Sequence, residues 1–355
     1  MPKDSVIYKD ELIQIWMALG FLLPPKDSYA LMEAIGNDYF NILLWNSLLQ
    51  DLERDEFGNI TTFKMHDLGQ ELSKHHSITL EAVQELNHIS KSIYLRLNTG
   101  VPNIKPTILK KNFERVQVLY AKARILGDVL PYFKHLTVLV LNTNEDIELP
   151  RSLSKMKYLK YLDISCFCSR LPSYISEFCN LQTLRVWKLD EVPKKFCNLI
   201  NLRHLFIKMA YSKSRCMFVG IERLTCLQTL PHFVVSRVQN CIVGQLGGLK
   251  HLKGKLELYG LGNRYSMDEA REASLCTKSN IELLKLEWSK NEDEVENREY
   301  NDEEVMKGLK PHANLKELTI VHFKGQKFAS WITMMINLVK ITLNRRLQGL
   351  ESLYT

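Results

Sequence analysis

Residues 136–141 read LTVLVL, and the same spacing returns as LKYLDI at 159–164, LQTLRV at 181–186 and LRHLFI at 202–207. The first leucines of these four units are 23, 22 and 21 residues apart. Side chains on a strand alternate between its two faces, so each LxxLxL unit places its last two apolar residues on one face. A single short strand cannot bury that face alone. The pattern therefore predicts a stack of parallel strands, one per repeat.

The array extends in both directions from these four units. Further units are LQTLPH from Leu227, a displaced LKGKLEL after Leu252, LKELTI from Leu315 and LVKITL from Leu338, and, towards the N-terminus, FERVQVL from Phe113 and ISKSIYLRL near Ile89. After each strand comes a stretch such as SRLPSYISEFCN (169–180), in which Leu-Pro ends a turn and a short apolar segment returns the chain to the next strand. A period of roughly 20–29 residues is that of leucine-rich repeats. We therefore expect an α/β fold, with a parallel-strand horseshoe solenoid over residues 86–355.

Some features of the array are irregular. In the leucine-rich-repeat motif an Asn or Cys follows the strand, and Asn144 fits, whereas Phe167 and Leu189 occupy the corresponding places in the next units. Residues 206–226 and 262–280 look like insertions between strands. The acidic run at 291–304 holds eight acids and one Arg, and we interpret it as a solvated loop.

The first 85 residues have a different pattern of apolar residues, without the leucine-rich repeat. Apolar residues at helical spacing predict a helix over Lys9–Leu23 and a second over Tyr29–Leu49. The expected core positions are Leu12, Ile15, Trp16 and Leu19 in the first helix, and Ile35, Tyr39, Leu43 and Leu44 in the second. The stretch 51–65 reads as two strands around a Phe57-Gly58-Asn59 turn, and a third helix follows His66-Asp67. This order predicts a winged-helix domain at 1–85.

Four stretches carry a resemblance to a known family. They are PKDSVIYKDELIQIWMALGFL (2–22), IGNDYF (35–40), DEFGNITTFKMHDL (55–68) and LGGLKHLKGKLELYGL (246–261). Together they resemble the C-terminal part of a plant intracellular immune receptor, a disease resistance protein of the coiled-coil NB-ARC leucine-rich-repeat family. The resemblance runs from about residue 2 to residue 343. It implies a role in plant defence and a cytoplasmic protein with a nuclear pool.

The resemblance also implies a nucleotide-binding residue. Met65, His66 and Asp67 match the MHD motif, whose histidine contacts the β-phosphate of ADP in resting receptors of that family. An imidazole at a helix N-terminus suits a phosphate oxygen, and Asp67 would cap that helix. However, the sequence has no GxxxxGK[ST] phosphate loop and no acidic Mg²⁺-binding strand. We therefore expect a truncated receptor that is not an enzyme. We also expect that this chain, when it is alone, does not bind the family's ADP or ATP tightly.

The resemblance also implies that the repeats recognise the partner. They would bind a pathogen effector or a guarded host protein, and would restrain a switch whose nucleotide-binding module belongs to a related receptor. The outward positions of the strands offer exposed aromatic and basic side chains of the kind that dominate interfaces. The predicted partner-binding residues are Tyr161, Arg185, Arg203, His204 and Phe206.

Two other function classes stay open. One is a generic leucine-rich-repeat scaffold, and the other is a winged-helix protein that binds nucleic acid. Against nucleic acid, the candidate recognition helix has no Lys or Arg after Lys26, and the wing at 51–57 is net acidic. We assign no catalytic residue and no metal ligand, because no GxSxG or HExxH motif occurs. The eight scattered cysteines predict reduced, mostly buried thiols.

Overall fold

The computed structural model describes most of the chain in separate segments. These are residues 5–22, 32–66, 77–80, 93–97, 113–122, 130–142, 148–165, 171–188, 192–209, 218–230, 232–236, 241–262, 266–289 and 302–344. The chain forms two compact units, the first made of residues 1–168 with 180–186 and the second of residues 169–179 with 187–355.

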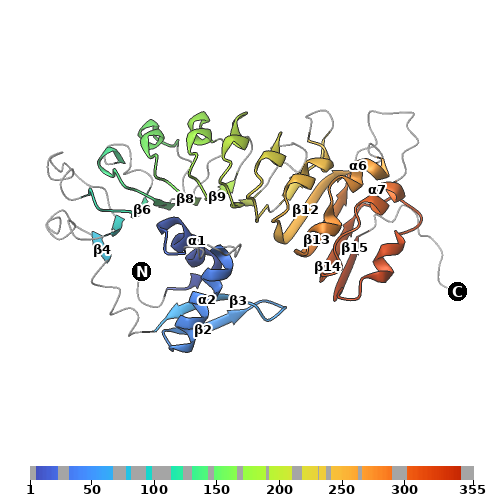
Figure 1. The fold of residues 1–355 in the computed structure, drawn as a ribbon, viewed down its shortest axis with the longest axis horizontal. Helices are drawn as coiled ribbons and strands as arrows, with labels where there is room; N and C mark the ends of the chain where they lie inside the picture. The colour runs from blue at the N-terminus through green and yellow to red at the C-terminus, as the bar shows by residue number, and fades with distance from the viewer. Residues whose placement is uncertain are drawn as a thin grey trace, which may run out of the picture. The chain divides into compact units, whose positions relative to one another are not determined.

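The N-terminal part of the first unit has the first two predicted helices and the wing, together with a short strand, β1, that was not predicted (Figure 1). They are β1 (Ile7–Tyr8), α1 (Lys9–Leu19), α2 (Met32–Trp45), β2 (Leu49–Arg54) and β3 (Ile60–Met65). The strands form an antiparallel sheet in the order β1-β3-β2. Helix α1 ends where Gly20 adopts a left-handed conformation, φ +79°, and its N–H bonds the carbonyls of Trp16 and Met17. The predicted third helix lies outside the described residues.

The core of this domain shows one error in the sequence prediction. Phe40 and Phe63 meet edge to face, with ring centroids 5.2 Å apart, and both are fully buried. Tyr39, the expected core residue, is 45% exposed. Tyr39 and Phe40 are adjacent, so they point about 100° apart on the helix, and only one can face the sheet.

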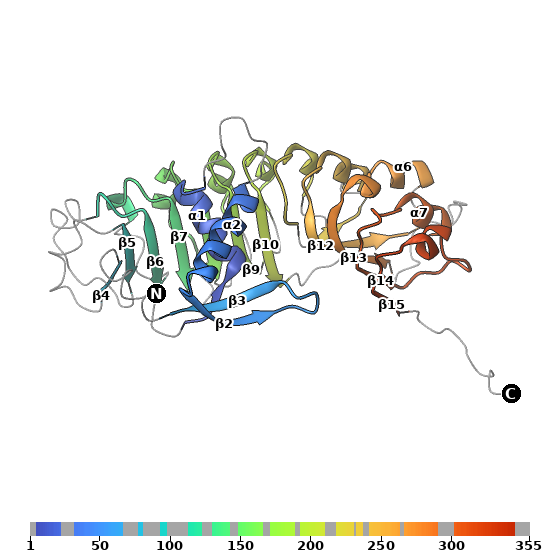
Figure 2. The same ribbon diagram turned by 60° about the horizontal axis from the view of Figure 1, so that its bottom comes forward.

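The wing is the predicted hairpin. Its turn is closed by Asp55, whose Oδ1 accepts hydrogen bonds from the backbone N–H groups of Phe57 (2.9 Å) and Asn59 (2.8 Å). Gly58 has a φ of +84°, which glycine adopts without strain. Figure 2 shows β2 and β3 side by side, as their antiparallel register requires.

The repeats form two sheets with one strand per repeat. The seven-stranded sheet has the order β10-β9-β8-β7-β6-β5-β4, and the five-stranded sheet has the order β11-β12-β13-β14-β15. Strands β4 to β9, and β11 to β15, pair in parallel. The strands are β4 (Ser77–Leu80), β5 (Tyr94–Leu97), β6 (Val118–Lys122), β7 (Val138–Asn142), β8 (Tyr161–Ser165), β9 (Thr183–Lys188), β10 (His204–Met209), β11 (His232–Val234), β12 (Lys253–Leu261), β13 (Asn280–Trp288), β14 (Glu317–Val321) and β15 (Lys340–Asn344).

Leucine-type side chains form the solenoid core as predicted. Leu139, Leu162 and Leu184 are aligned in register on β7, β8 and β9, and all three are fully buried. Short 3-10 turns close the repeats, as at Arg151–Lys155 after Pro150 and Ser173–Glu177 after Pro172. Each turn returns the chain to the next strand.

An asparagine ladder joins the repeats, but it precedes the strands. The side-chain amide of each asparagine donates to a backbone carbonyl of the preceding repeat: Asn180 to Lys157 (3.0 Å), Asn201 to Cys179 (2.7 Å), Asn314 to Ser279 (3.1 Å) and Asn337 to Ala313 (3.0 Å). Buried Lys278 does the same with its Nζ, 3.0 Å from the Leu249 carbonyl. Asn144, the position expected from the motif, lies outside the described residues.

Two sequence expectations change in the second unit, at β13 and at the end of the acidic run. Residues 280–288, which were not recognised as a repeat unit, form strand β13, whose apolar residues follow the repeat spacing as Ile281, Leu284 and Leu286. The stretch interpreted as an insertion at 262–280 contains helix α6 (Met267–Arg271), which begins with a capping box between Ser266 and Glu269. The end of the acidic run is helical, because α7 spans Asp302–Gly308; its acids suit a helix N-terminus. Residues 290–301 lie outside the described part.

The boundary predicted at residues 85 and 86 also lies outside the described residues, although β4 already pairs with β5 at Ser77–Leu80.

Among the described helices, none has the length and hydropathy needed to cross a bilayer. The expectation of reduced cysteines is wrong for Cys241, which is disulfide-bonded. Cys179, Cys197, Cys226 and Cys276 are free thiols.

Candidate functional site

Helix α1 is packed on three sides. Leu12 and Trp16 pack towards the winged-helix core around Phe40 and Phe63. Ile13 and Met17 pack against Leu22 and α2. The third side, made of Ile15, Ala18 and Leu19, packs on the strands of the repeats.

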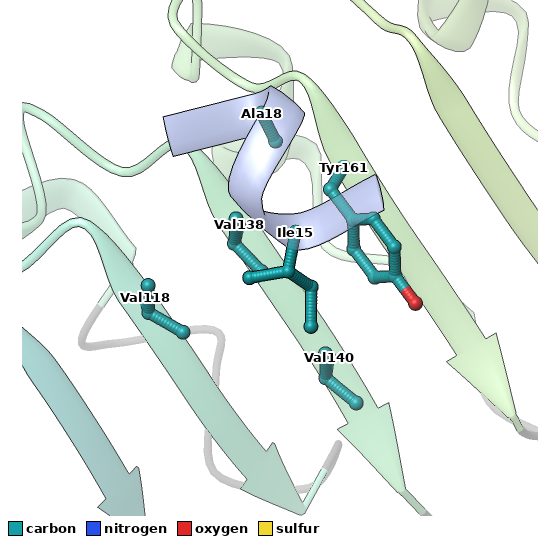
Figure 3. Close-up of a cluster of buried hydrophobic side chains, with 6 residues drawn as sticks. All are labelled: Ile15, Ala18, Val118, Val138, Val140 and Tyr161. Atoms are coloured by element: carbon teal, nitrogen blue, oxygen red, sulfur yellow. The ribbon is translucent and has the colours of Figure 1, made fainter. Parts of the chain in front are cut away.

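The repeats meet α1 with their outward face, the face opposite the leucine core. Figure 3 shows Ile15 pointing towards Val138 and Val140 of β7, with the ring of Tyr161 on β8 beside it. Val118 on β6 completes this apolar strip. Figure 2 shows α1 beside β7, in agreement with the contacts. We call this set of residues the α1 contact.

The strand register explains why these side chains meet. One column across the sheet holds Tyr94, Val118, Val138, Tyr161 and Thr183, and the next holds Arg96, Tyr120, Val140, Asp163 and Arg185. Valines fill the middle of both columns, and polar or aromatic residues lie towards the ends. The face is therefore apolar where α1 covers it and polar beyond.

Burial gives the contact most of its free energy. Val138 and Tyr161 are fully buried, and Ile15, Ala18, Val118 and Val140 are each less than a tenth exposed. Full burial of an aliphatic or aromatic side chain contributes about 1.5–3 kcal/mol. The contact therefore supplies several kcal/mol before its polar groups are considered.

Charged groups border the apolar strip at the N-terminus of α1. Arg185 on β9 pairs with Asp163 on β8, with Nε 3.2 Å from Oδ2. Burial raises the pKa of Glu11, Arg185 opposes that rise, and Asp163 adds to it. Arg185 in turn interacts with both Glu11 and Asp10. The first turn of α1 thus lies in the field of an arginine that already has a partner on the sheet.

Two polar atoms lose their water without gaining a partner. Among the described residues, neither Gln14 Oε1 nor the Tyr161 hydroxyl has a hydrogen-bond partner, and both are buried. Burial also raises the pKa of Tyr161 well above its usual range. An unsatisfied buried polar group costs about 1–3 kcal/mol. The α1 contact is consequently weaker than its apolar area suggests, and this favours a contact that can open.

The predicted partner-binding residues are only partly exposed. Tyr161 was expected to face solvent and is instead buried under Ile15. His204 is 2% exposed, with Nδ1 3.0 Å from Thr229 Oγ1 and its ring stacked near Phe206. The expected exposure of these two residues is therefore wrong, because the outward face of a strand is not always free. Arg185, Arg203 and Phe206 are half-buried.

The MHD residues lie at the end of β3. Met65 closes the strand and packs on the winged-helix core, and the backbone N–H of His66 bonds the Leu48 carbonyl at 2.9 Å. The His66 side chain is half-buried, and Asp67 lies outside the described residues.

Sequence reasoning missed that α1 is a contact element, although a signal was present. Val118, Val138 and Val140 occupy outward strand positions, where a solvated face would carry polar residues. Three valines in adjacent register positions indicate a face that something covers.

The chain matches two family models. Residues 1–73 match the disease resistance protein winged helix domain, and residues 243–354 match the R13L1/DRL21 leucine-rich repeats. Among solved structures, an internalin from Listeria monocytogenes is 14% identical with a TM-score of 0.45, covering 80% of this chain and 89% of that one. Because that score is low, the family assignment rests on the sequence matches.

Curated relatives cover nearly all of this chain. Putative disease resistance protein RGA4 of Solanum bulbocastanum is 34% identical over 93% of this chain and 31% of its own length. Putative disease resistance protein RGA1 of the same species is 30% identical over 99% and 33%, and putative disease resistance RPP13-like protein 1 of Arabidopsis thaliana is 31% identical over 94% and 33%. The chain spans about a third of the length of these relatives. It belongs to the plant disease resistance proteins and carries their winged-helix domain and leucine-rich repeats.

Proposed function

We propose that this chain acts in plant defence by recognising a protein partner, a pathogen effector or a host protein altered by one, through its repeats. We further propose that the repeats restrain the winged-helix domain until the partner binds. The observation that supports this most is the packing of Ile15 against Val138, Val140 and Tyr161. A face suited to binding a partner is occupied by a helix of the same chain.

Competition for that face would couple recognition to release. A partner that needs the strands under α1 binds only the open form, so its binding shifts the population towards that form. The shift cannot exceed the partner's preference for the open state, and a change from 1:99 to 99:1 needs about 5.5 kcal/mol. The unsatisfied Gln14 and Tyr161 atoms lower the free energy that the partner must supply.

In this proposal the nucleotide is bound mainly by a separate nucleotide-binding module. In the proposal, His66 meets a phosphate of ADP only when a nucleotide-binding module with its own phosphate loop docks beside the winged-helix domain. ADP would then hold the resting state and ATP the active one. This chain would supply an N–H donor to the phosphate and no hydrolytic group.

The α1 contact can be tested with one substitution and a matched control. Ile15→Asp places a carboxylate in the contact, and Ile42→Asp makes the same change on α2, where Ile42 is 49% exposed. Hydrogen exchange of the α1 and β6–β8 amides is measured in both variants of the full chain. We expect faster exchange of both segments in Ile15→Asp, with the repeat core intact, and no change in Ile42→Asp. Unchanged exchange in Ile15→Asp would argue against the restraint.

A second experiment tests the switch. The chain, with His66 or His66→Ala, is mixed with a separately expressed nucleotide-binding module of a related receptor, and retained ADP is measured. The proposal expects ADP to be held in the mixture, more weakly with His66→Ala, and to be released faster when Ile15→Asp opens the contact. If the two proteins do not interact, the chain acts through its repeats alone.

A further inference from the structure

The side of α1 that packs on the repeats is a regular stripe of side chains. Its positions follow the spacing i, i+3, i+4, i+7 and i+8 and are Glu11, Gln14, Ile15, Ala18 and Leu19. Residues at this spacing share one face of an α-helix, and here Ile15, Ala18 and Leu19 contact the strands. Gln14 is 3% exposed and Glu11 is half-buried. The stripe therefore consists of an acid, a buried amide and three apolar residues.

The strands under the stripe fit its apolar half closely. Figure 3 shows Ile15 directed towards Val138 and Val140, with Ala18 one turn further along the helix. Ala18 is 1% exposed, so its small side chain lets the helix lie close to the sheet. A larger side chain there would have to displace packed neighbours, which is costly in a close-packed contact. The face thus requires a small residue at this position.

The acidic end of the stripe also has a partner on the strands. Arg185 interacts with both Glu11 and Asp10, and it pairs with Asp163 on the sheet at 3.2 Å. Acids are favoured in the first turn of any helix by its dipole. An acid at the Glu11 position is therefore stabilised by the helix dipole and by Arg185, whereas a basic residue there would be repelled by both.

Helix α1 is an imperfect occupant of this face. Among the described residues, Gln14 Oε1 is buried and has no hydrogen-bond partner. An apolar residue at that position would avoid the cost of burying an unpaired polar atom. A helix with the same stripe and an apolar residue in place of Gln14 would therefore bind the face more tightly than α1 does. It needs this advantage, because α1 is tethered to the face and competes at a high effective concentration.

We propose that the face under α1 is the docking site for an amphipathic helix of a partner protein, which repeats the α1 stripe with an apolar residue at the Gln14 position. The partner's helix places an acid beside Arg185 and a small residue at the Ala18 position. Its sequence contains the spacing acid-x-x-apolar-aliphatic-x-x-small-aliphatic. This inference rests on the proposed function, because the helix binds only after α1 has left the face.

Other occupants fit the face less well. A second copy of this chain would offer the same α1 with the same Gln14, so it would bind no better than the α1 that is already tethered there. An extended peptide would need a free strand edge to pair with. Strands β6, β7 and β8 lie inside the seven-stranded sheet and each has a neighbour on both sides.

The probe for the test is a helical peptide that copies residues 9–20 with leucine at the Gln14 position. Changes at the positions that face the winged-helix domain keep it soluble and, through a lactam bridge between positions 13 and 17, helical: Leu12→Ala, Trp16→Ala, Ile13→Lys and Met17→Glu. Binding is measured by fluorescence anisotropy with the full chain carrying Ile15→Asp, in which α1 no longer fits. We expect binding there, and about tenfold weaker binding to wild type, where α1 competes. A peptide that keeps Gln14 should bind about tenfold more weakly.

A charge exchange tests the acidic end of the stripe. The peptide with Glu11→Lys should bind the Ile15→Asp chain more weakly than the peptide with Glu11. Adding Arg185→Glu to the chain should reverse this preference, because the carboxylate then attracts the lysine. Arg151→Glu, at an exposed position of the same unit, is the matched control and should leave the preference unchanged.

Hydrogen exchange separates failure of the docking site from failure of the proposed function. Faster exchange of α1 in Ile15→Asp, with the β3 amides still protected, shows that the face is open. Absence of peptide binding to that open face, or a preference that Arg185→Glu leaves unchanged, would overturn the docking site and leave the restraint intact. Unchanged exchange would overturn both. A wild-type dimer that Ile15→Asp converts to monomer would assign the face to a second copy's α1 instead.

Discussion

The ring of Tyr161 on β8 lies fully buried against Ile15 of α1, so a residue on the outward face of a repeat strand is part of a hydrophobic core. The strand periodicity alone assigns Tyr161 to the face away from the leucines, and that assignment is correct. What covers the face comes from a helix almost 150 residues earlier in the chain. The contact joins the winged-helix domain to the repeats within one compact unit.

The hydroxyl of Tyr161 should be dispensable to this contact. Because the hydroxyl is buried without a partner, Tyr161→Phe removes a desolvation cost and keeps the ring. We expect the free energy of opening α1 to stay equal or to rise by about 1 kcal/mol, measured by hydrogen exchange of α1 amides. Tyr158→Phe, at an exposed position, serves as the control. A loss above about 1 kcal/mol would mean that the hydroxyl has a favourable role in the contact.

The α1 contact should weaken as pH rises above 4.5. Burial raises the pKa of Glu11 from its ordinary value of 4.5 when α1 is docked, so the docked form binds a proton more tightly than the open form. By linkage, docking is strongest below pH 4.5, weakens as pH rises through the raised pKa, and is constant above it. Glu11→Gln should flatten this dependence.

Opening free energies of the α1 amides at several pH values between about 4 and 8 would test the linkage, after correction for intrinsic exchange. Asp38→Asn, on the exposed side of α2, is the matched carboxylate control and should leave the slope unchanged. The same slope in wild type and Glu11→Gln would assign the titration to another group near the contact.

Local patterns predicted the elements of this chain well, and contacts between distant elements poorly. The LxxLxL spacing located β7 to β10, and the Phe57-Gly58-Asn59 turn located the wing, because both depend on neighbours in sequence. Strand β13 was not predicted, because Ile281 replaces the first leucine of the unit and an inserted helix changes the spacing between units. Tyr39 was preferred to Phe40 because the phase of α2 is set by its contact with β3.

The candidate site could be anticipated only in part. The partner-binding set was chosen for outward position and residue type, and Arg185 does lie at the border of the α1 contact. Neither criterion shows whether a face is already covered. Val118, Val138 and Val140 carried that information, since a solvated strand face rarely holds three adjacent valines.

The asparagine ladder should contribute measurably to the stability of the repeats. Asn201 donates to the Cys179 carbonyl at 2.7 Å across the gap between repeats, and its replacement by Ala leaves that carbonyl with one bond fewer. We expect Asn201→Ala to lower the free energy of unfolding by about 0.5–1.5 kcal/mol, measured by urea denaturation. Asn41→Ala, at an exposed site on α2, should change it by less than about 0.5 kcal/mol. Equal effects of the two changes would deny the ladder a structural role.

Lys278 also bonds a carbonyl of the preceding repeat, and the lowered pKa of its amine should make the second unit more stable at high pH. It is 1% exposed, and burial lowers the pKa of its amine from 10.5 to about 8. Between these values the unfolded chain holds the proton and the folded chain does not, so the free energy of unfolding rises with pH. The contribution approaches about 3 kcal/mol at pH 10.5. Urea titrations at pH 7.5 and 10 of wild type and Lys278→Met isolate it, with exposed Lys155→Met as control. If wild type and Lys278→Met gain or lose stability in parallel, the amine of Lys278 keeps its proton in the folded state.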